Sequence, residues 1–287
     1  MKSHINSYKT SFLITLIAIL FPILFPNVYV IRILTMIFIY CILAASWDLL
    51  YGFTGQLSFG HAALLGIGGY TSSLINLNFG ISPWLSVCIG ALVTGFIGLT
   101  FGFPSLRLRG PYFVITTIAI AETFRLIATN WIEVTKGPYG VFGFSPLVSD
   151  PIQRYYLYFF ILIISVYTLY RITKSDIGLA FKSIREDEIL AEAMGINTTK
   201  YKLLAFFLSS FFAGLAGALY AHCTLLMSPD AMSSTISALI VAMALVGGRG
   251  TIWGSIIGAF VIYSLVEYLR CLLYTSDAAD ELDGVDL

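Results

Sequence analysis

The sequence predicts an all-α, polytopic bundle of transmembrane helices with about 8–10 membrane segments, because a helix needs about 20 apolar residues to cross a bilayer. The chain is 58% hydrophobic and 11% charged, with a mean hydropathy of +0.87. A soluble domain carries roughly a quarter charged residues. This chain cannot cover a water-facing surface, and its apolar runs recur along the length, so we predict an integral membrane protein.

The candidate spans follow one another with short connections. The first, 11–31, lacks a small-x-small cleavage site and contains Pro22 and Pro26, so we interpret it as a retained helix rather than a signal peptide. Small residues recur four apart in several spans, a spacing that lets helices in lipid approach closely. The spans are 11–31, 32–51, 56–78, 81–103, 112–130, 154–172, 203–222, 235–248 and 252–270.

Orientation follows from the Lys and Arg residues, which stay on the cytoplasmic side of a membrane. With the N-terminus in the cytoplasm, the Gly- and Pro-rich loop 131–153 lies outside and the polar segment 174–201 lies inside. Only Arg32, Lys136, Arg154 and Arg270 then fall outside. The residues that fall inside are Lys2, Lys9, Arg107, Arg109, Arg171, Lys174, Lys182, Arg185, Lys200, Lys202 and Arg249.

The stretch 55–78 combines an apolar span with polar residues and glycines. We predict a broken or re-entrant segment, since transporters use broken helices beside the substrate path. Gln56, Ser58, His61 and Gly66 are its candidate path residues. The alternative is that the glycines serve close packing and that Gln56 and Ser58 cap the helix. His61 is better interpreted as a packing or interfacial residue than as a proton relay.

Charged residues inside the spans are few. Glu122 and Arg125 are three apart, a spacing at which two side chains of a helix can meet. They are either path or gate residues or a structural ion pair, because a charge in the bilayer faces the bundle or a cavity. Asp48 lies near the inner end of its span, where water can reach it. Ion-coupled transport would need more buried carboxylates.

The segment 174–201 is the long polar stretch of the chain. Ser175 or Asp176 can cap a helix start, Gly195 can end the helix, and Asn197 or Thr198 can cap the next. A solvated loop is the simpler interpretation, but an amphipathic helix facing the cytoplasm is typical of an element that docks into a groove of a partner. The positions compatible with an apolar face are Ile177, Phe181, Ile184, Ala191 and Met194.

Several functions are excluded. There is no GxxxxGK[ST] motif, so the chain has no P-loop of its own for ATP. The four Cys are far apart, without a CxxC, so we expect neither a zinc site nor a disulfide framework. The net charge is zero, which gives no reason to expect nucleic acid. We therefore expect no cofactor or metal bound to this chain and no catalytic residues.

Four stretches, in order, resemble the LivM-type permease of bacterial branched-chain amino acid ABC importers. They are "GQLSFGHAALLGIGGYTSSL", "LRGPYFVITTIAIAETFRL", "IREDEILAEAMGINTTKYKLLAFFLSSFFAGLAGALYAH" and "VGGRGTIWGSIIGAF". The resemblance covers roughly residues 32–270. It implies a multi-pass protein of the bacterial inner membrane that moves Leu, Ile or Val by alternating access.

The resemblance also implies partners: a second permease of the LivH type, two ABC ATPase subunits that carry ATP and Mg, and a periplasmic or lipid-anchored substrate-binding protein. The stretch 186–196 corresponds to the family's ATPase-contacting loop. The docking candidates are Arg185, Glu186, Asp187, Glu188, Ala191 and Gly195.

The C-terminal end differs in amino-acid composition from the rest of the chain. Five of the sixteen acidic residues fall in the last eleven positions. We expect a permease domain over 1–270 and a tail, 271–287, that resembles translated adapter read-through and is not native sequence; a natural short acidic tail is the alternative.

Other functions stay open at this point. A permease for a sugar or a urea-like solute is one, since the spans do not distinguish substrates. An ion-coupled secondary transporter or channel would need neither an ATPase partner nor the 176–195 segment. A membrane scaffold without transport would leave the interrupted segment 55–77 unexplained.

Overall fold

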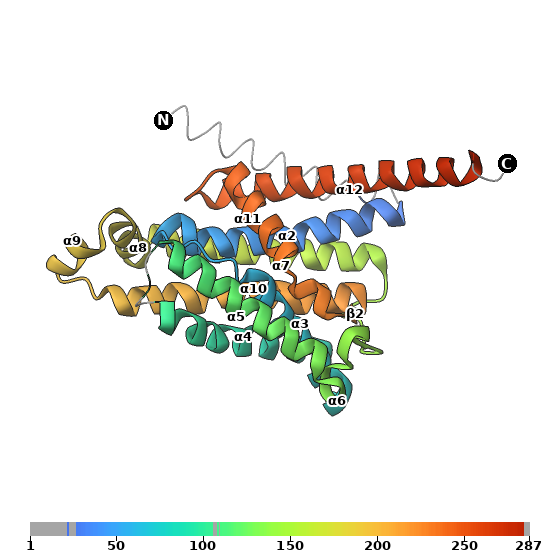
Figure 1. Ribbon diagram of the computed structural model, residues 1–287, viewed down its shortest axis with the longest axis horizontal. Helices are drawn as coiled ribbons and strands as arrows, with labels where there is room; N and C mark the ends of the chain where they lie inside the picture. Colours follow the sequence, from blue (N-terminus) through green and yellow to red (C-terminus); the bar gives the residue numbers. More distant parts are fainter. Residues whose placement is uncertain (1–21, 23–26, 106–107, 109, 284–287) are drawn as a thin grey trace.

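The computed structural model describes residues 22, 27–105, 108 and 110–283, and within them the chain is a bundle of helices that lie along its long axis (Figure 1). The expected all-α fold is confirmed. Within these residues, six helices are long and apolar enough to cross a membrane. They are α2 (Val28–Thr54), α4 (Pro83–Ser105), α5 (Pro111–Asn130), α7 (Pro151–Lys174), α10 (Thr198–Thr224) and α12 (Ile252–Asp283).

Two shorter helices, α3 (His61–Phe79) and α11 (Ser234–Gly247), complete the bundle. The predicted first span, 11–31, lies outside the described residues except for Pro22 and residues 27–31. That end belongs to α2, so the predicted boundary at residue 32 is wrong. The Asn27 side chain accepts a hydrogen bond from the Tyr29 N–H at 3.0 Å and starts α2 earlier.

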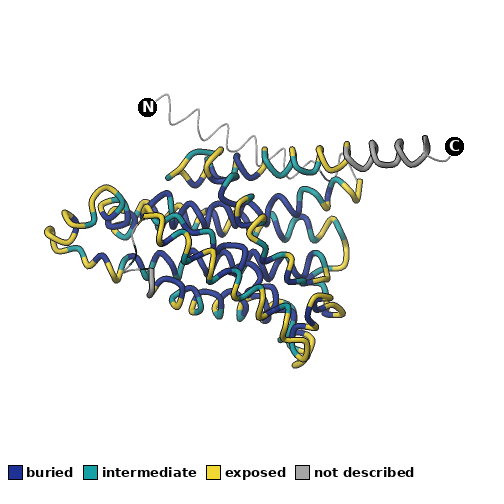
Figure 2. The backbone as a smooth tube through the Cα atoms, viewed as in Figure 1, coloured by how far each residue is buried: buried dark blue, intermediate teal, exposed yellow. Residues whose placement is uncertain are grey.

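The centre of the bundle is built around α2 and α10. α10 packs against α3, α4 and α2, and α2 packs in turn against α7 and α12. Figure 2 shows the buried positions concentrated along these helices, while the outer faces are exposed. Small residues allow the close approach: a Cβ added to Gly217, one of the small residues spaced four apart, would lie 1.8 Å from the carbonyl oxygen of Leu65 in α3. The small-residue spacing therefore serves helix packing, as predicted.

At one end of the bundle, the expected outer loop is folded. It contains α6 (Ile132–Thr135), the 3₁₀ turn η1 (Gly137–Tyr139) and strand β1 (Val141–Phe142). β1 pairs antiparallel with β2 (Leu226–Met227), with Val141 opposite Met227. After β2, the turn η2 (Pro229–Met232) re-enters the bundle, and a Cβ on Gly66 would lie 2.2 Å from Met232. η2 therefore brings the chain back into the bundle, where it packs against α3, before α11 begins. α11 has only the remaining part of the bundle to cross, and its 14 residues are enough for that.

At the opposite end lie α8 (Asp176–Glu186) and α9 (Glu188–Ala193), which project beyond the bundle (Figure 1). The residues 176–197, comprising these helices and the turn into α10, are called the elbow below. α12 begins near this end and continues as a helix to Asp283, and its apolar span, Ile252–Leu272, agrees with the predicted last span, 252–270, to within two residues.

Candidate functional site

The elbow consists of two helices rather than the single helix to Gly195 that the sequence predicts. Asp187 has extended backbone angles (φ −155°, ψ 113°) and breaks the helix. Its carboxylate accepts hydrogen bonds from the N–H groups of Ile189 and Leu190 at 2.9 and 3.1 Å, which caps α9. Gly195 has a φ of +87°, which suits glycine at a helix end. The predicted cap at Asn197 is confirmed by its bond from the Lys200 N–H.

Some of the predicted docking residues face the bundle, and others are exposed at the surface. Arg185 turns back toward the bundle, and its Nη1 donates to the carbonyl oxygen of Gly52 at 2.7 Å. Glu188 accepts from Lys202 Nζ at 2.5 Å, and Ala191 is 2% exposed. Only Glu186, Asp187 and Gly195 of the candidates lie in exposed positions.

α9 and the turn that follows it expose apolar side chains that the sequence analysis does not single out as a docking surface. Ile189 is 67% exposed, Leu190 59% and Met194 75%. Met194 was expected on the buried face with Ile184 and Ala191, but the break at Asp187 shifts the phase of α9 relative to α8. Three large apolar side chains exposed close together are typical of a surface that a partner covers. Asp187 is the residue in the sequence that could have revealed them: as a helix cap it ends α8 and begins α9, so the apolar positions must be counted afresh from residue 188.

The elbow is joined to the last turn of α2. Asp48 is fully buried, and its Oδ1 accepts from the Gly250 N–H in the α11–α12 turn at 2.8 Å. A Cβ added to Gly52 would lie 2.6 Å from that same nitrogen. With the bond from Arg185 to Gly52, the end of α2 connects the elbow to α11 and α12.

The predicted break is confirmed at residues 55–60, which are not helical, but α3 runs unbroken through the glycines that follow. Trp47 Nε1 donates to the carbonyl oxygen of Ser58 at 2.6 Å, and the Phe59 N–H donates to Thr117 Oγ1 at 3.1 Å. The first turn of α3 meets α11, because the Ala62 N–H donates to Ser237 Oγ at 3.2 Å. The break thus joins α2, α3, α5 and α11 inside the bundle.

His61 is fully buried at the start of α3. Its Nε2 lies 2.9 Å from Ser209 Oγ, which donates its own proton to the Ser46 carbonyl oxygen at 2.7 Å. Because that hydroxyl has one hydrogen, His61 Nε2 must be the donor in this pair. This network, and the contact of Gly66 with Met232, match the packing interpretation of these two residues.

Glu122 and Arg125 form an ion pair on α5. Arg125 Nε donates to both carboxylate oxygens of Glu122, at 2.9 and 3.0 Å. The two side chains are 40% and 31% exposed, on a helix whose outward face also carries Ile118 and Leu126. A charged pair facing hydrocarbon is costly, so this face of α5 suits a protein partner or water better than lipid.

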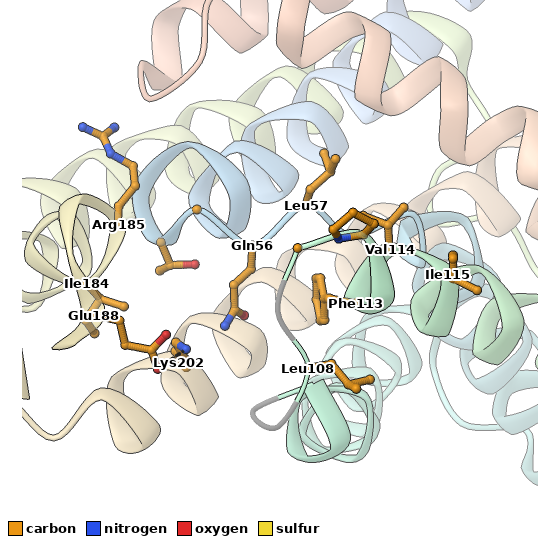
Figure 3. A pocket seen from close by; sticks show the side chains of 14 residues that line it. Gln56, Leu57, Leu108, Phe113, Val114, Ile115, Ile184, Arg185, Glu188 and Lys202 are labelled. Carbon is orange, nitrogen blue, oxygen red and sulfur yellow. Dashed lines mark hydrogen bonds and ion pairs between the residues drawn. The ribbon is translucent and has the colours of Figure 1, made fainter.

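A cavity of about 690 Å³ opens where the break, α5, the elbow and α10 meet (Figure 3). We call it the elbow pocket. Gln56 reaches down between Lys202 and Phe113, and Glu188 lies beside Lys202. Of the predicted path residues, the pocket brings in Gln56, while Ser58, at 2% exposed, and His61 are enclosed by the bundle.

Comparison with known proteins supports one family. The family model described as branched-chain amino acid transport system / permease component matches residues 29–282. The chain is 31% identical over 265 residues to the high-affinity branched-chain amino acid transport system permease protein LivM of Salmonella typhimurium and, equally, to that of Escherichia coli. It is 25% identical over 241 residues to the guanosine ABC transporter permease protein NupQ of Bacillus subtilis, covering 76% of this chain and 74% of that protein.

The alignments with the two LivM proteins cover 82% of this chain and 62% of theirs, so the chain spans less than two thirds of their length. No solved structure gives a significant match. The family match nevertheless includes every membrane-spanning helix described above from its first turn onward. The chain therefore belongs to the family of branched-chain amino acid transport system permease components, which are multi-pass membrane proteins.

Proposed function

We propose that this chain is the membrane-spanning permease subunit of an ATP-driven importer of branched-chain amino acids in a bacterial inner membrane. The likeness to LivM along the bundle carries the proposal. Its partners are a second, LivH-type permease, two ABC ATPase subunits that bind ATP and Mg, and a periplasmic or lipid-anchored binding protein. The chain itself hydrolyses nothing.

The elbow end of the bundle is the cytoplasmic end in this proposal. Basic residues gather there, as expected for the cytoplasmic side of a membrane protein. The N-terminus then lies in the cytoplasm as well. The described basic residues at the elbow end are Arg171, Lys174, Lys182, Arg185, Lys200, Lys202 and Arg249, against Arg32, Lys136, Arg154 and Arg270 at the other end.

The ATPase subunits dock on the elbow through Ile189, Leu190 and Met194. Their exposure supports this, because an aqueous surface gains little from three large apolar side chains unless a partner covers them. Glu186 lies at the rim of the surface. The inward-facing Arg185 and Glu188 hold the elbow to the bundle.

Movement of the elbow reaches the membrane through contacts that are already formed. Arg185 binds the end of α2, Asp48 of α2 holds the α11–α12 turn, and Ser237 of α11 binds the first turn of α3. A shift of the elbow therefore changes the packing of α11 against α3, beside the break at 55–60. This is a rigid-body route for alternating access.

The substrate path runs along the exposed face of α5 and past the break. Glu122 and Arg125 support this placement, since their charges need a polar environment within the membrane. The first turn of α3 places the partly positive end of a helix beside the break, which suits the carboxylate of an amino acid. The second permease closes the path from the other side.

The second candidate substrate class is a nucleoside, and the likeness to the guanosine permease of Bacillus subtilis favours it. The test is to co-express the chain with candidate ATPase and second-permease subunits, purify the assembly, and reconstitute it with its binding protein. We expect uptake of labelled leucine that unlabelled valine competes and guanosine does not. Uptake of guanosine without uptake of leucine would overturn the proposed substrate.

A further inference from the structure

Two lysine side chains line a second cavity at the elbow end of the bundle. This cavity has a volume of about 190 Å³ and lies where the ends of α2 and α7 and the helix α8 meet the α11–α12 turn. Lys174 comes from the last turn of α7, and Lys182 comes from α8. No Asp or Glu of the described part of the chain lines it. We call it the lysine cavity.

The positive charges of the lysine cavity are not paired. Neither Lys174 nor Lys182 forms a hydrogen bond or an ion pair through its side chain with another described residue, whereas Lys202, at the same end, is paired with a carboxylate. Lys182 Nζ lies 5.7 Å from the ring centroid of the buried Phe53, and Lys174 Nζ lies 5.8 Å from that of Tyr170. These rings attract the ammonium groups but neutralise no charge. Two cations, each with three donor hydrogens, are therefore available at one space.

The lysine cavity lies at the level where the membrane-spanning segments end. The apolar span of α7 ends at Lys174, and that of α12 begins at Ile252, which also lines the cavity. Trp253, in the first turn of α12, lines it as well and is 56% exposed. Trp and Tyr side chains concentrate at the membrane–water interface, at the depth of the lipid headgroups. The charges of the cavity are therefore at headgroup depth.

An exposed apolar face on each of two helices leads away from the lysine cavity toward the middle of the membrane. α7 and α12 both pack against α2, so the two helices flank it. On each helix the exposed apolar residues are three or four apart, which places them on one face. They are Phe160, Ile163 and Tyr167 on α7, and Trp253, Ile257 and Phe260 on α12. A hydrocarbon chain attached to a group in the cavity has apolar surface to lie along.

We propose that the lysine cavity binds the phosphate of an anionic phospholipid in the cytoplasmic leaflet; the choice of leaflet rests on the proposed function. The phosphate oxygens accept hydrogen bonds from Lys174 and Lys182, and the acyl chains lie along the exposed faces of α7 and α12. An anionic headgroup suits the cavity because two positive charges line it without a carboxylate. A headgroup with a quaternary ammonium would bring a third positive charge.

The bound lipid connects the elbow to the membrane-spanning helices at a second point, apart from the bond between Arg185 and Gly52. Lys174 belongs to α7 and Lys182 to the first helix of the elbow, so a phosphate that both lysines hold restrains α8 against α7 and the start of α12. The anionic lipid content of the leaflet thereby regulates how firmly the elbow is held.

The test is binding of dioctanoyl phosphatidylglycerol to the purified full chain in detergent, measured by native mass spectrometry. We expect saturable binding, at least about tenfold tighter than that of dioctanoyl phosphatidylcholine. Inorganic phosphate should not displace the lipid. The double variant Lys174→Gln/Lys182→Gln should weaken phosphatidylglycerol binding at least about tenfold. The matched control, Lys136→Gln/Lys200→Gln, removes the same charge from lysines outside the cavity and should bind as the unchanged chain does.

A second variant, Lys174→Arg/Lys182→Arg, keeps both charges and should retain binding, which separates the loss of charge from a loss of packing. The variants are compared at equal elution volume and unfolding temperature, and the comparison of the two lipids needs no variant. Equal binding of the two lipids, displacement by inorganic phosphate, equal binding by the Gln variant and its control, or loss of binding in the Arg variant would overturn the proposal. The proposed function would stand in each case, because only absence of leucine uptake by the assembled transporter contradicts it.

Discussion

Arg185 donates a hydrogen bond to the carbonyl oxygen of Gly52, 2.7 Å away, and so ties the elbow to the last turn of α2 across 133 positions of sequence. The same guanidinium forms an ion pair with Glu186 at 2.5 Å, and this pair helps to fix the orientation of the Arg185 side chain. The elbow is therefore not a free arm beside the membrane. It is fixed to the helix whose Asp48 also holds the α11–α12 turn.

Replacing Arg185 with Ala should uncouple ATP hydrolysis from transport. The ATPase subunits still bind, because the exposed apolar face of α9 is unchanged, but the movement no longer reaches α2. We expect the number of leucine molecules transported per ATP hydrolysed to fall at least about fivefold, and the chain to lose roughly 1–3 kcal/mol of stability. Tyr167→Ala, a change on the outer face of α7, is the control. Full coupling in the Arg185→Ala transporter would show that the bond carries no movement.

Replacing Ile189 with Asp should prevent assembly with the ATPase subunits. The side chain is 67% exposed, so the chain itself folds normally, whereas a carboxylate in a desolvated interface without a partner costs several kcal/mol. Co-purification of the ATPase with the tagged permease measures the effect. Tyr139→Asp, at the other end and 83% exposed, is the matched control. Equal ATPase recovery from both variants would contradict docking on α9.

Gly68→Ala should weaken the bundle itself. The added Cβ lies 2.2 Å from the Gly214 carbonyl oxygen, so α3 and α10 must move apart. Overpacking of this kind costs about 1–3 kcal/mol. Gly60→Ala, whose added Cβ meets its nearest neighbour at 3.5 Å, is the control. The unfolding temperature in detergent should fall for Gly68→Ala alone; an equal fall for both would mean that the close approach is not what matters.

His61→Gln should leave leucine uptake and its pH profile unchanged. The amide nitrogen of Gln can replace Nε2 as the donor to Ser209. His61→Leu removes the donor to Ser209, whose hydroxyl keeps its bond to the Ser46 carbonyl oxygen, and should cost about 1 kcal/mol of stability for the one hydrogen bond lost. Uptake measured between pH 5.5 and 8 distinguishes the roles. A pH optimum that disappears in His61→Gln would identify His61 as a proton carrier.

The helices could be predicted because their signals are local. Apolar runs of sufficient length place α4, α5, α7 and α10 within a few residues, and Asn197 caps α10 as its side-chain chemistry predicts. The break at Gly55 and Gln56 could be predicted for the same reason. The start of α2 could not, because it depends on a cap at Asn27 inside an apolar run.

The site could be predicted only in part, because its contacts are not local. Arg185 has the charge of a docking residue, but its partner is a main-chain carbonyl group far away in sequence, which no side-chain pattern reveals. The role of Gly66 likewise depends on Met232, which reaches it only because η2 folds back into the bundle. On α9, the break at Asp187 decides which apolar residues face water.

The central claim is that the energy for transport comes from partner ATPases through the elbow. The most direct measurement is leucine accumulation in proteoliposomes that hold either this chain alone or the assembled transporter with its binding protein. The account predicts accumulation only in the assembly supplied with ATP on the elbow side. Accumulation of leucine against its gradient by the chain alone, driven by a proton or sodium gradient, would contradict it.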